Sequence, residues 1–396
     1  MISNRASKIQ VSPTMKVAGK AKELKAQGID VIDLSLGEPD FPTPQNVKDA
    51  AVRGLAEGHT RYTLNPGTME LRKAISTKLK KENGLDYEPS EIIVSSGCKQ
   101  SIFNAVMATV NEGDEVIIPA PYWVSYPDMV SLAGGVCVFP QTKEENGFRI
   151  TPDELEAVIT PKTRMLILCN PSNPTGGSYD EKWLKSIAEV VKKHNFYVLS
   201  DEIYEKLVFD DFKFISFPAI DPELKPKTIL VNGVSKSYAM TGWRIGYTAG
   251  PKDVIQAMDK IQSNSTSGPS AISQYATIEA LLGDQSEVER MRVEFEKRRN
   301  YFFDEITKIA GFTCYKPEGA FYLFPGIKAF FGKTYNGKVI KDSMDFSMFL
   351  LEEARIAAVA GSPFGSDGYI RFSYATSMAQ LEDAVRRIKA AVSKLV

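Results

Sequence analysis

The segment VNGVSKSYAMTGWRIGY (231–247) places Lys236 among small and apolar residues, with Arg244 further along the same segment. Desolvation disfavours an ammonium ion and lowers the pKa of a lysine, so a neutral amine there can attack a carbonyl and form a Schiff base. Arg244 could hold an anionic group of the captured aldehyde. A plainer interpretation fits equally well, in which Lys236 extends into solvent and Arg244 forms an ordinary ion pair. Both interpretations stay open from this segment alone.

Asp201 ends the apolar run FYVLS (196–200) and would stand at the mouth of a sheet. It could simply cap a helix that follows. With a pyridine-containing cofactor it could instead keep the ring nitrogen protonated, and a protonated ring is an electron sink that stabilises a carbanion. The choice between the two depends on what else converges on Asp201.

Four further features have both a chemical and a structural interpretation. SSGCKQ (95–100) could open a helix whose backbone N–H groups cradle a phosphate, or it could be a simple turn. Trp123 could lie on a flat cofactor or belong to the core. NPSNPTGG (170–177) reads as a loop in which Asn173 could donate to a phenolic oxygen, or which could be only a turn. Arg371 could clamp a carboxylate or form a structural salt bridge.

Short apolar runs alternate with helical patterns and predict the elements that position these residues. β-Branched runs that are apolar on both faces are typical of parallel strands covered by helices. The expected strands lie in 91–96, 114–120, 136–140, 164–170, 196–202, 228–235 and 244–250, with helices such as 101–110 and 183–194 between them. Because loops at the carboxyl ends of parallel strands carry the ligands of such folds, one cleft is expected there. It would gather Ser96, Gly97, Cys98, Trp123, Asn173, Asp201, Tyr204, Ser235 and Lys236.

The sequence predicts an α/β fold with two domains. Residues 46–284 would form a large domain with a mostly parallel central sheet flanked by helices. The pattern changes near residue 285, where a charged helix (286–310) leads to short strands. Residues 1–45 and 285–396 would form a smaller α+β domain, because VIDLSLGEPD (31–40) must reach the cleft.

Composition excludes several classes of function. The 396 residues carry 48 basic and 49 acidic side chains, so no charge surplus points to nucleic acid or to an anionic membrane. The four cysteines are widely spaced and the two histidines lie in no metal-ligand cluster, which predicts free thiols and no metal site. The polar N-terminus and the lack of a long apolar run predict a cytoplasmic protein.

Several motifs in order resemble the class I pyridoxal-phosphate aminotransferases of fold type I, in the branch of bacterial aspartate and prephenate aminotransferases. They are SLGEPDFPTP, RYTLNPGTMELR, NPSNPTGG, SDEIYE, SKSYAMTGWRIGY and YIRFSYA, and the resemblance covers essentially the whole chain. It implies that Lys236 forms a Schiff base with pyridoxal 5'-phosphate and later shuttles the substrate proton. It further implies Asp201 at the pyridine nitrogen, Asn173 and Tyr204 at the phenolic oxygen and Trp123 on the ring. Gly97, Cys98, Ser235, Arg244 and Tyr62 of the neighbouring subunit would hold the phosphate, so the resemblance implies a homodimer with shared sites.

The resemblance also implies how substrate is bound. Arg371 would clamp the α-carboxylate beside the backbone of Gly37, with Trp123 and Asn173 nearby. The stretch QSNSTSGPS (262–270) lacks the arginine that some members use for a distal carboxylate, and Lys99 fits the position used in this branch. Members that accept prephenate carry a basic residue where this chain has Gln10, between Lys8 and Lys16.

The expected activity is therefore transfer of the amino group of L-aspartate to 2-oxoglutarate, in amino-acid metabolism and biosynthesis. Aromatic, alanine or prephenate preference remains open. So do a β-lyase or decarboxylase of the same fold and, from another class, a scaffold protein that has lost catalysis.

Overall fold

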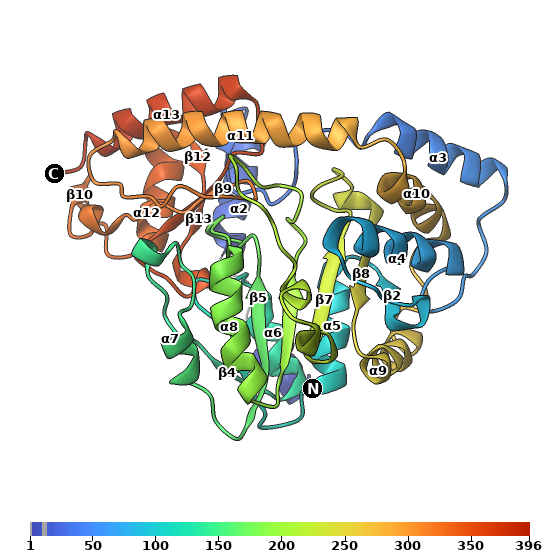
Figure 1. Ribbon diagram of the computed structural model, residues 1–396. Helices are drawn as coiled ribbons and strands as arrows, with labels where there is room; N and C mark the ends of the chain where they lie inside the picture. The colour runs from blue at the N-terminus through green and yellow to red at the C-terminus, as the bar shows by residue number, and fades with distance from the viewer. Residues whose placement is uncertain (1, 10–13) are drawn as a thin grey trace.

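A central seven-stranded sheet organises the chain (Figure 1). The computed structural model describes residues 2–9 and 14–396. The strand order is β2-β8-β7-β6-β5-β3-β4. The strands are β2 (Ile92–Ser95), β8 (Gly246–Ala249), β7 (Thr228–Gly233), β6 (Tyr197–Asp201), β5 (Thr163–Cys169), β3 (Glu115–Ile117) and β4 (Val136–Val138). All seven predicted runs contain a strand, which confirms the predicted α/β fold with its mostly parallel sheet. Only β8 is antiparallel to its two neighbours.

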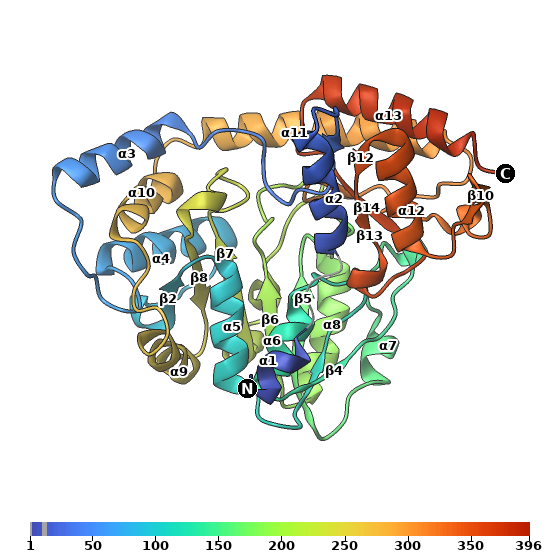
Figure 2. The same cartoon turned by 180° about the vertical axis from the view of Figure 1, so that it is seen from behind.

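Helices cover both faces of this sheet, as Figures 1 and 2 show from opposite sides. Successive residues of a strand point to opposite faces. On β5, Met165 and Ile167 join the core beneath α5 (Cys98–Thr109), α6 (Tyr126–Ala133) and α9 (Lys252–Ser263). Leu166 and Leu168 join the core beneath α7 (Pro152–Glu156) and α8 (Glu181–Lys193) on the other face. The alternation explains why β5 is apolar without a break from Met165 to Leu168.

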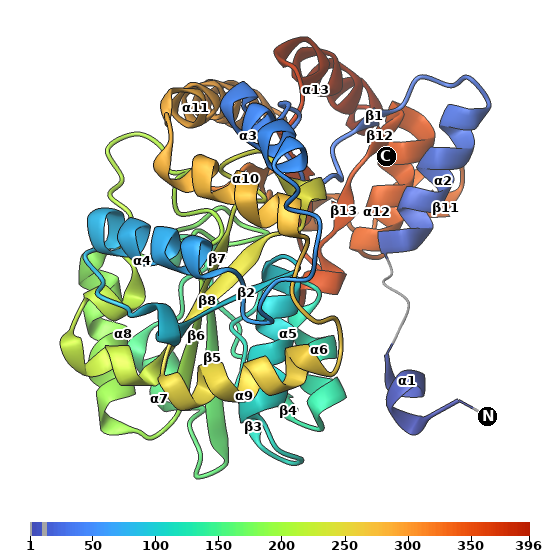
Figure 3. The ribbon, with the colours of Figure 1, turned by 90° about the vertical axis from the view of Figure 1, so that its right-hand side faces the viewer.

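Further helices pack around the edges of the sheet. α4 (Met69–Asn83) packs on the β2 end together with α3 (Gln45–Ala56) and α10 (Ala271–Leu282). A short helix, α1 (Asn4–Lys8), contacts α6. It lies well apart from α2, as Figure 3 shows. The long α11 (Ser286–Thr307) then runs along the top of the molecule (Figure 1).

The remaining segments share a second large core. It includes side chains of α11, α12 (Ser343–Phe349), α13 (Met378–Val392) and the sheet β13-β14-β9. Those strands are β13 (Val359–Ala360), β14 (Ile370–Ser373) and β9 (Tyr322–Leu323). β1 (Ile32–Asp33) pairs in parallel with β12 (Ile356–Ala357), and α2 (Thr14–Ala26) packs beside them. A hairpin joins β10 (Thr334–Tyr335) and β11 (Lys338–Val339).

The β1–β12 pair ties the N-terminal segment to the C-terminal part of the chain, so residues 35–38 reach the edge of the central sheet. The predicted domain boundaries at 45/46 and 284/285 remain a prediction. Within residues 2–9 and 14–396, no helix has the length and hydropathy needed to span a membrane.

Candidate active site

A cavity of about 540 Å³ lies at the carboxyl ends of the parallel strands. Segment 35–38 and the β13–β14 region face it from the other side. Most of the predicted site residues line it together: Gly37, Cys98, Lys99, Trp123, Asn173, Asp201, Tyr204, Ser235, Lys236, Arg244 and Arg371. Gly97 and Tyr62 do not line it.

Lys236 is partly buried in the cavity wall, in the turn that follows β7. Burial lowers its pKa to about 8, so a substantial share of the amine is neutral near physiological pH. Its Nζ donates a hydrogen bond to the carbonyl of Gly37. The cavity position and the lowered pKa favour the reactive interpretation of Lys236 over a lysine extending into solvent.

Asp201 ends β6, and the residues after it form a turn rather than a helix, so the helix-cap interpretation is wrong. The Tyr126 hydroxyl donates to Asp201 Oδ2 at 2.7 Å, and the Ile203 amide donates to Oδ1 at 3.4 Å. Burial raises the pKa of Asp201 to about 6, although the Tyr126 hydrogen bond acts in the opposite direction. A cationic partner in the cavity would therefore strongly favour the ionised carboxylate.

Arg371 extends from β14 into the same cavity and is buried. Its Nη1 donates to Asn173 Oδ1 at 2.9 Å and its Nη2 to the Ser35 carbonyl at 2.8 Å. Nε has no partner. No carboxylate of the described residues pairs with Arg371 within 4.0 Å, so its charge is uncompensated within the described chain. The salt-bridge interpretation fails, and a buried, unpaired guanidinium suits an anionic ligand.

The opposite end of the cavity has the features of an anion cradle. α5 begins at Cys98, and the first N–H groups of a helix have no partner within it. The Arg244 guanidinium lies beside this helix start and is held by the carbonyls of Thr241 and Ser96, at 2.8 and 3.2 Å. Gly97 takes a left-handed φ of 86°, and a Cβ there would collide with Arg244. Glycine therefore allows the helix start and the guanidinium to approach each other closely.

Trp123 and Lys99 face each other across the wall of the cavity. Lys99 Nζ lies 5.0 Å from the centroid of the Trp123 ring. Desolvation, with a smaller contribution from Arg244, lowers the pKa of Lys99. Tyr62 is fully exposed in the loop before α4, away from the lining residues. In the single chain Tyr62 therefore contributes nothing to this cavity.

The sequence profile of the class I and II aminotransferases matches residues 29–388. The chain belongs to this family. It is a pyridoxal-phosphate-dependent aminotransferase of fold type I.

The aminotransferase is similar along its whole length to bacterial aspartate and aspartate/prephenate aminotransferases and to solved structures. It is 52% identical to a probable aspartate/prephenate aminotransferase of Rickettsia bellii, over 100% of both chains. The crystal structure of the aspartate aminotransferase from Rhizobium meliloti superposes with a TM-score of 0.97, at 46% identity and 100% coverage of both chains. A Thermus thermophilus aspartate aminotransferase solved with maleate gives a TM-score of 0.93, at 41% identity and 99% coverage of both chains.

The residues of the aminotransferase fit pyridoxal phosphate. An amine, a carboxylate and an anion cradle all border one cavity, at Lys236, Asp201 and the start of α5. These are the groups that an aldehyde, a pyridine nitrogen and a phosphate require. The Asn173 oxygen accepts from Arg371, which leaves its amide nitrogen available as a donor.

Two tyrosines that contact the site residues were not anticipated from the sequence. Tyr126 contacts Asp201, and Tyr322 contacts both Tyr204, with 2.9 Å between the hydroxyl oxygens, and the Arg371 guanidinium, which lies 4.5 Å from the centroid of its ring. Both tyrosines lie in apolar, aromatic segments that predict core packing. Their only sequence signal was a hydroxyl in an otherwise apolar run, because a buried tyrosine hydroxyl usually needs a partner.

Proposed function

We propose that this aminotransferase transfers the amino group of L-aspartate to 2-oxoglutarate and yields oxaloacetate and L-glutamate. The observation that carries the proposal is that two cationic side chains, Arg371 and Lys99, border the same cavity. Two separated cations suit a dicarboxylic substrate. The relatives named aspartate aminotransferase support the proposal, as does the Thermus thermophilus structure, whose ligand, maleate, is a dicarboxylate.

In this proposal, the side chains around the cofactor hold it in one orientation. Lys236 attaches it, Asp201 binds the pyridine nitrogen, and Asn173 and Tyr204 donate to the phenolic oxygen. Trp123 lies on the ring. The phosphate is held by Gly97, Cys98, Ser235, Arg244 and Tyr62 of the neighbouring subunit. When bound, pyridoxal phosphate supplies an electron sink that stabilises negative charge at the substrate Cα.

Substrate binding and proton transfer are assigned to three groups. Arg371 clamps the α-carboxylate next to the Gly37 backbone, and Lys99 binds the distal carboxylate. Lys236 removes the proton from the substrate Cα, a role that its pKa of about 8 supports because the neutral amine is the base. Burial of Arg371 and Asp201 keeps water from weakening these charge interactions.

The working unit is proposed to be a homodimer. Tyr62, to which this proposal gives a phosphate-binding role, is fully exposed and does not line the cavity of its own chain. We also propose the division into a large domain (46–284) and a small one (1–45 and 285–396). A cytoplasmic location in amino-acid biosynthesis is part of the proposal, supported by four free cysteines.

Steady-state assays with aspartate, tyrosine, alanine and prephenate as amino donor or acceptor test the substrate. We expect kcat/KM to be largest for aspartate. A preference of about tenfold or more for alanine or tyrosine, equal to ~1.4 kcal/mol, would contradict the proposal. Ammonia and pyruvate from a cysteine conjugate would instead indicate a β-lyase.

Prephenate is the second candidate substrate, and the name of the Rickettsia bellii relative favours it. The residue that bears on it, Gln10, lies outside the described residues. Glutamate-dependent conversion of prephenate, measured in the same assay, decides whether this activity accompanies that toward aspartate.

A further inference from the structure

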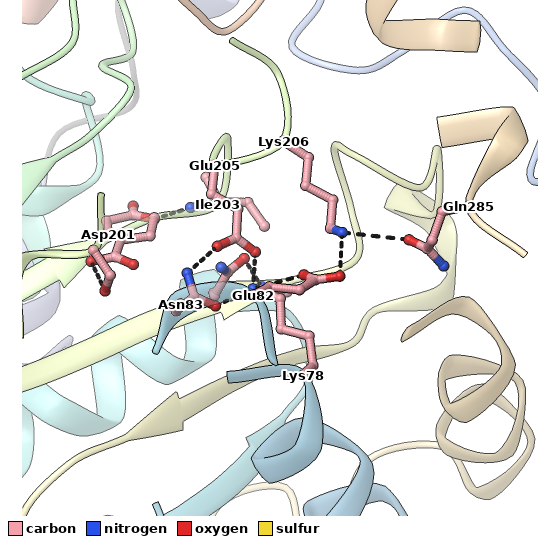
Figure 4. Close-up of polar contacts among 12 residues, drawn as sticks. Lys78, Glu82, Asn83, Asp201, Ile203, Glu205, Lys206 and Gln285 are labelled. Carbon is pink, nitrogen blue, oxygen red and sulfur yellow. Dashed lines mark hydrogen bonds and ion pairs between the residues drawn. The ribbon is translucent and has the colours of Figure 1, made fainter. Parts of the chain in front are cut away.

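Lys78 and Glu205 form a buried ion pair between α4 and the turn that carries Asp201 and Tyr204. Figure 4 shows Lys78 of α4 extending toward Glu205. Only 1% of the Lys78 side chain and 7% of the Glu205 side chain are exposed. Lys78 Nζ also donates to Asn83 Oδ1 at 2.8 Å, and Asn83 Nδ2 donates to Glu205 Oε2 at 2.8 Å. Lys78, Asn83 and Glu205 form a ring of mutual contacts, which we term the α4 clamp. Glu82 Oε2 lies 3.6 Å from Lys78 Nζ at the edge of this ring.

The α4 clamp joins two elements that are far apart in sequence. Lys78 and Asn83 belong to α4, while Glu205 directly follows Tyr204 in the turn after β6. Within this turn the Glu205 amide donates to the Glu202 carbonyl at 3.0 Å, and the Leu207 amide to the Tyr204 carbonyl at 2.8 Å. The turn therefore presents Tyr204 to the cavity while Glu205 is anchored to α4.

Stability alone does not call for an ion pair at a buried interface of this kind. Removing two charges from water costs several kcal/mol per ion, and apolar pairs of similar volume are often as stable as buried ion pairs or more so. Burial alone would raise the pKa of the Glu205 carboxyl, but Lys78, with smaller contributions from Asn83 and Lys206, outweighs burial and lowers this pKa. What an ion pair with defined hydrogen bonds adds over an apolar contact is a fixed geometry.

We propose that the α4 clamp is a positioning device that fixes the turn 201–205 and thereby aims the Tyr204 hydroxyl at the phenolic oxygen of the bound cofactor. This inference rests on the proposed role of Tyr204. A donor at the phenolic oxygen stabilises its anionic form and so lowers the pH at which the visible absorption band of the bound cofactor changes. The pH midpoint of this change therefore measures whether the Tyr204 hydroxyl donates to the phenolic oxygen, and it can be measured without substrate turnover.

The test compares K78M/E205L with the wild-type holoenzyme. Both charges are removed at similar volume, and half-exposed Asn83 can bind water instead, so the variant should fold and melt within a few degrees of wild type. We expect the pH midpoint of the band to rise by roughly half a unit or more. In K78M/E205Q the glutamine amide can still bond Asn83, so the midpoint should lie between those of K78M/E205L and wild type. This variant also serves as the test if K78M/E205L folds poorly.

Y204F completes a double-mutant cycle. Y204F alone should raise the midpoint at least as much as K78M/E205L, and combining the two should add little, because both remove the same hydrogen bond. The control K80Q/D86N removes an exposed ion pair anchored on the same helix, 69% and 76% exposed, and should leave the midpoint unchanged.

Two results would overturn different statements. If Y204F shifts the midpoint but neither clamp variant does, the α4 clamp is purely structural and this inference is wrong. If Y204F itself leaves the midpoint at the wild-type value, the assignment of Tyr204 in the proposed function fails, and the inference fails with it.

Discussion

Replacing Tyr126 by phenylalanine removes one oxygen atom and should slow catalysis while the fold is kept. The Tyr126 hydroxyl donates to Asp201 Oδ2 at 2.7 Å, and both side chains are buried. This hydrogen bond favours the ionised carboxylate, and burial still raises the pKa of Asp201 to about 6. Without Tyr126, nothing but the backbone amide of Ile203 donates to this carboxylate among the described residues.

The size of the effect follows from the energy of one charge-assisted hydrogen bond. Such a bond contributes roughly 1.5–3 kcal/mol. One pKa unit corresponds to about 1.4 kcal/mol, so the pKa of Asp201 in the cofactor-free protein should rise by roughly 1–2, to between roughly 7 and 8. A carboxyl that keeps its own proton holds the pyridine nitrogen protonated less well, so kcat should fall by roughly 10- to 100-fold near pH 7.

Steady-state kinetics of Y126F with aspartate between pH 6 and 9 measure the predicted fall in kcat. The fall in kcat should be larger at pH 6.5 than at pH 8.5. KM should change little because the Tyr126 hydroxyl bonds Asp201, whereas Arg371 bonds Asn173 and the Ser35 carbonyl. The matched control is Y374F, which removes an equally buried hydroxyl that donates to the Ala320 carbonyl at 3.2 Å, in the other core. A kcat for Y126F within about twofold of wild type at every pH would refute the reasoning.

Three further substitutions test the site. D201N should stabilise the cofactor-free protein by about 2–3 kcal/mol at pH 7.5, because a carboxyl whose folded pKa is raised to about 6 loses stability as the pH rises through that value. In urea unfolding the stability gained by D201N should vanish below about pH 4. A gain that does not change with pH would contradict the raised pKa of Asp201. K99M should raise KM for aspartate and 2-oxoglutarate by roughly tenfold and leave KM for alanine unchanged; an equal rise for alanine would mean that Lys99 does not bind the distal carboxylate. K236A should carry no cofactor mass after borohydride reduction and denaturation, whereas wild type should retain it by mass spectrometry; retention by K236A would exclude Lys236 as the attachment point.

The secondary structure was accessible from the sequence because it depends on local pattern. β5 is apolar without a break from Met165 to Leu168, since its two faces contact different helical layers, and such a run has few alternatives to a buried strand. Antiparallel β8 was not predictable in the same way. Its run resembles the parallel ones, and only the path of the chain between Lys236 and Gly246 decides its direction.

The site was predictable where function demands a particular residue type at a strand end. Lys236, Asp201 and Arg371 were singled out as candidates because a charged group in an apolar segment is costly to bury without a partner or ligand. All three border one cavity. Their partners were not predictable. Tyr126 meets Asp201 across 75 residues and Asn173 meets Arg371 across 198, and no local periodicity encodes such distances.

The sequence by itself determined which residue types stand at the ends of the strands, and the order of the motifs determined the family. Only the tertiary structure decided how those residues are tuned. Burial lowers the pKa of Lys236 and raises that of Asp201, and the amount depends on how neighbouring elements exclude water. The contact between Lys78 and Glu205 likewise exists only because α4 packs against the turn after β6. Local pattern records what each segment prefers, whereas desolvation and pairing are properties of segments brought together.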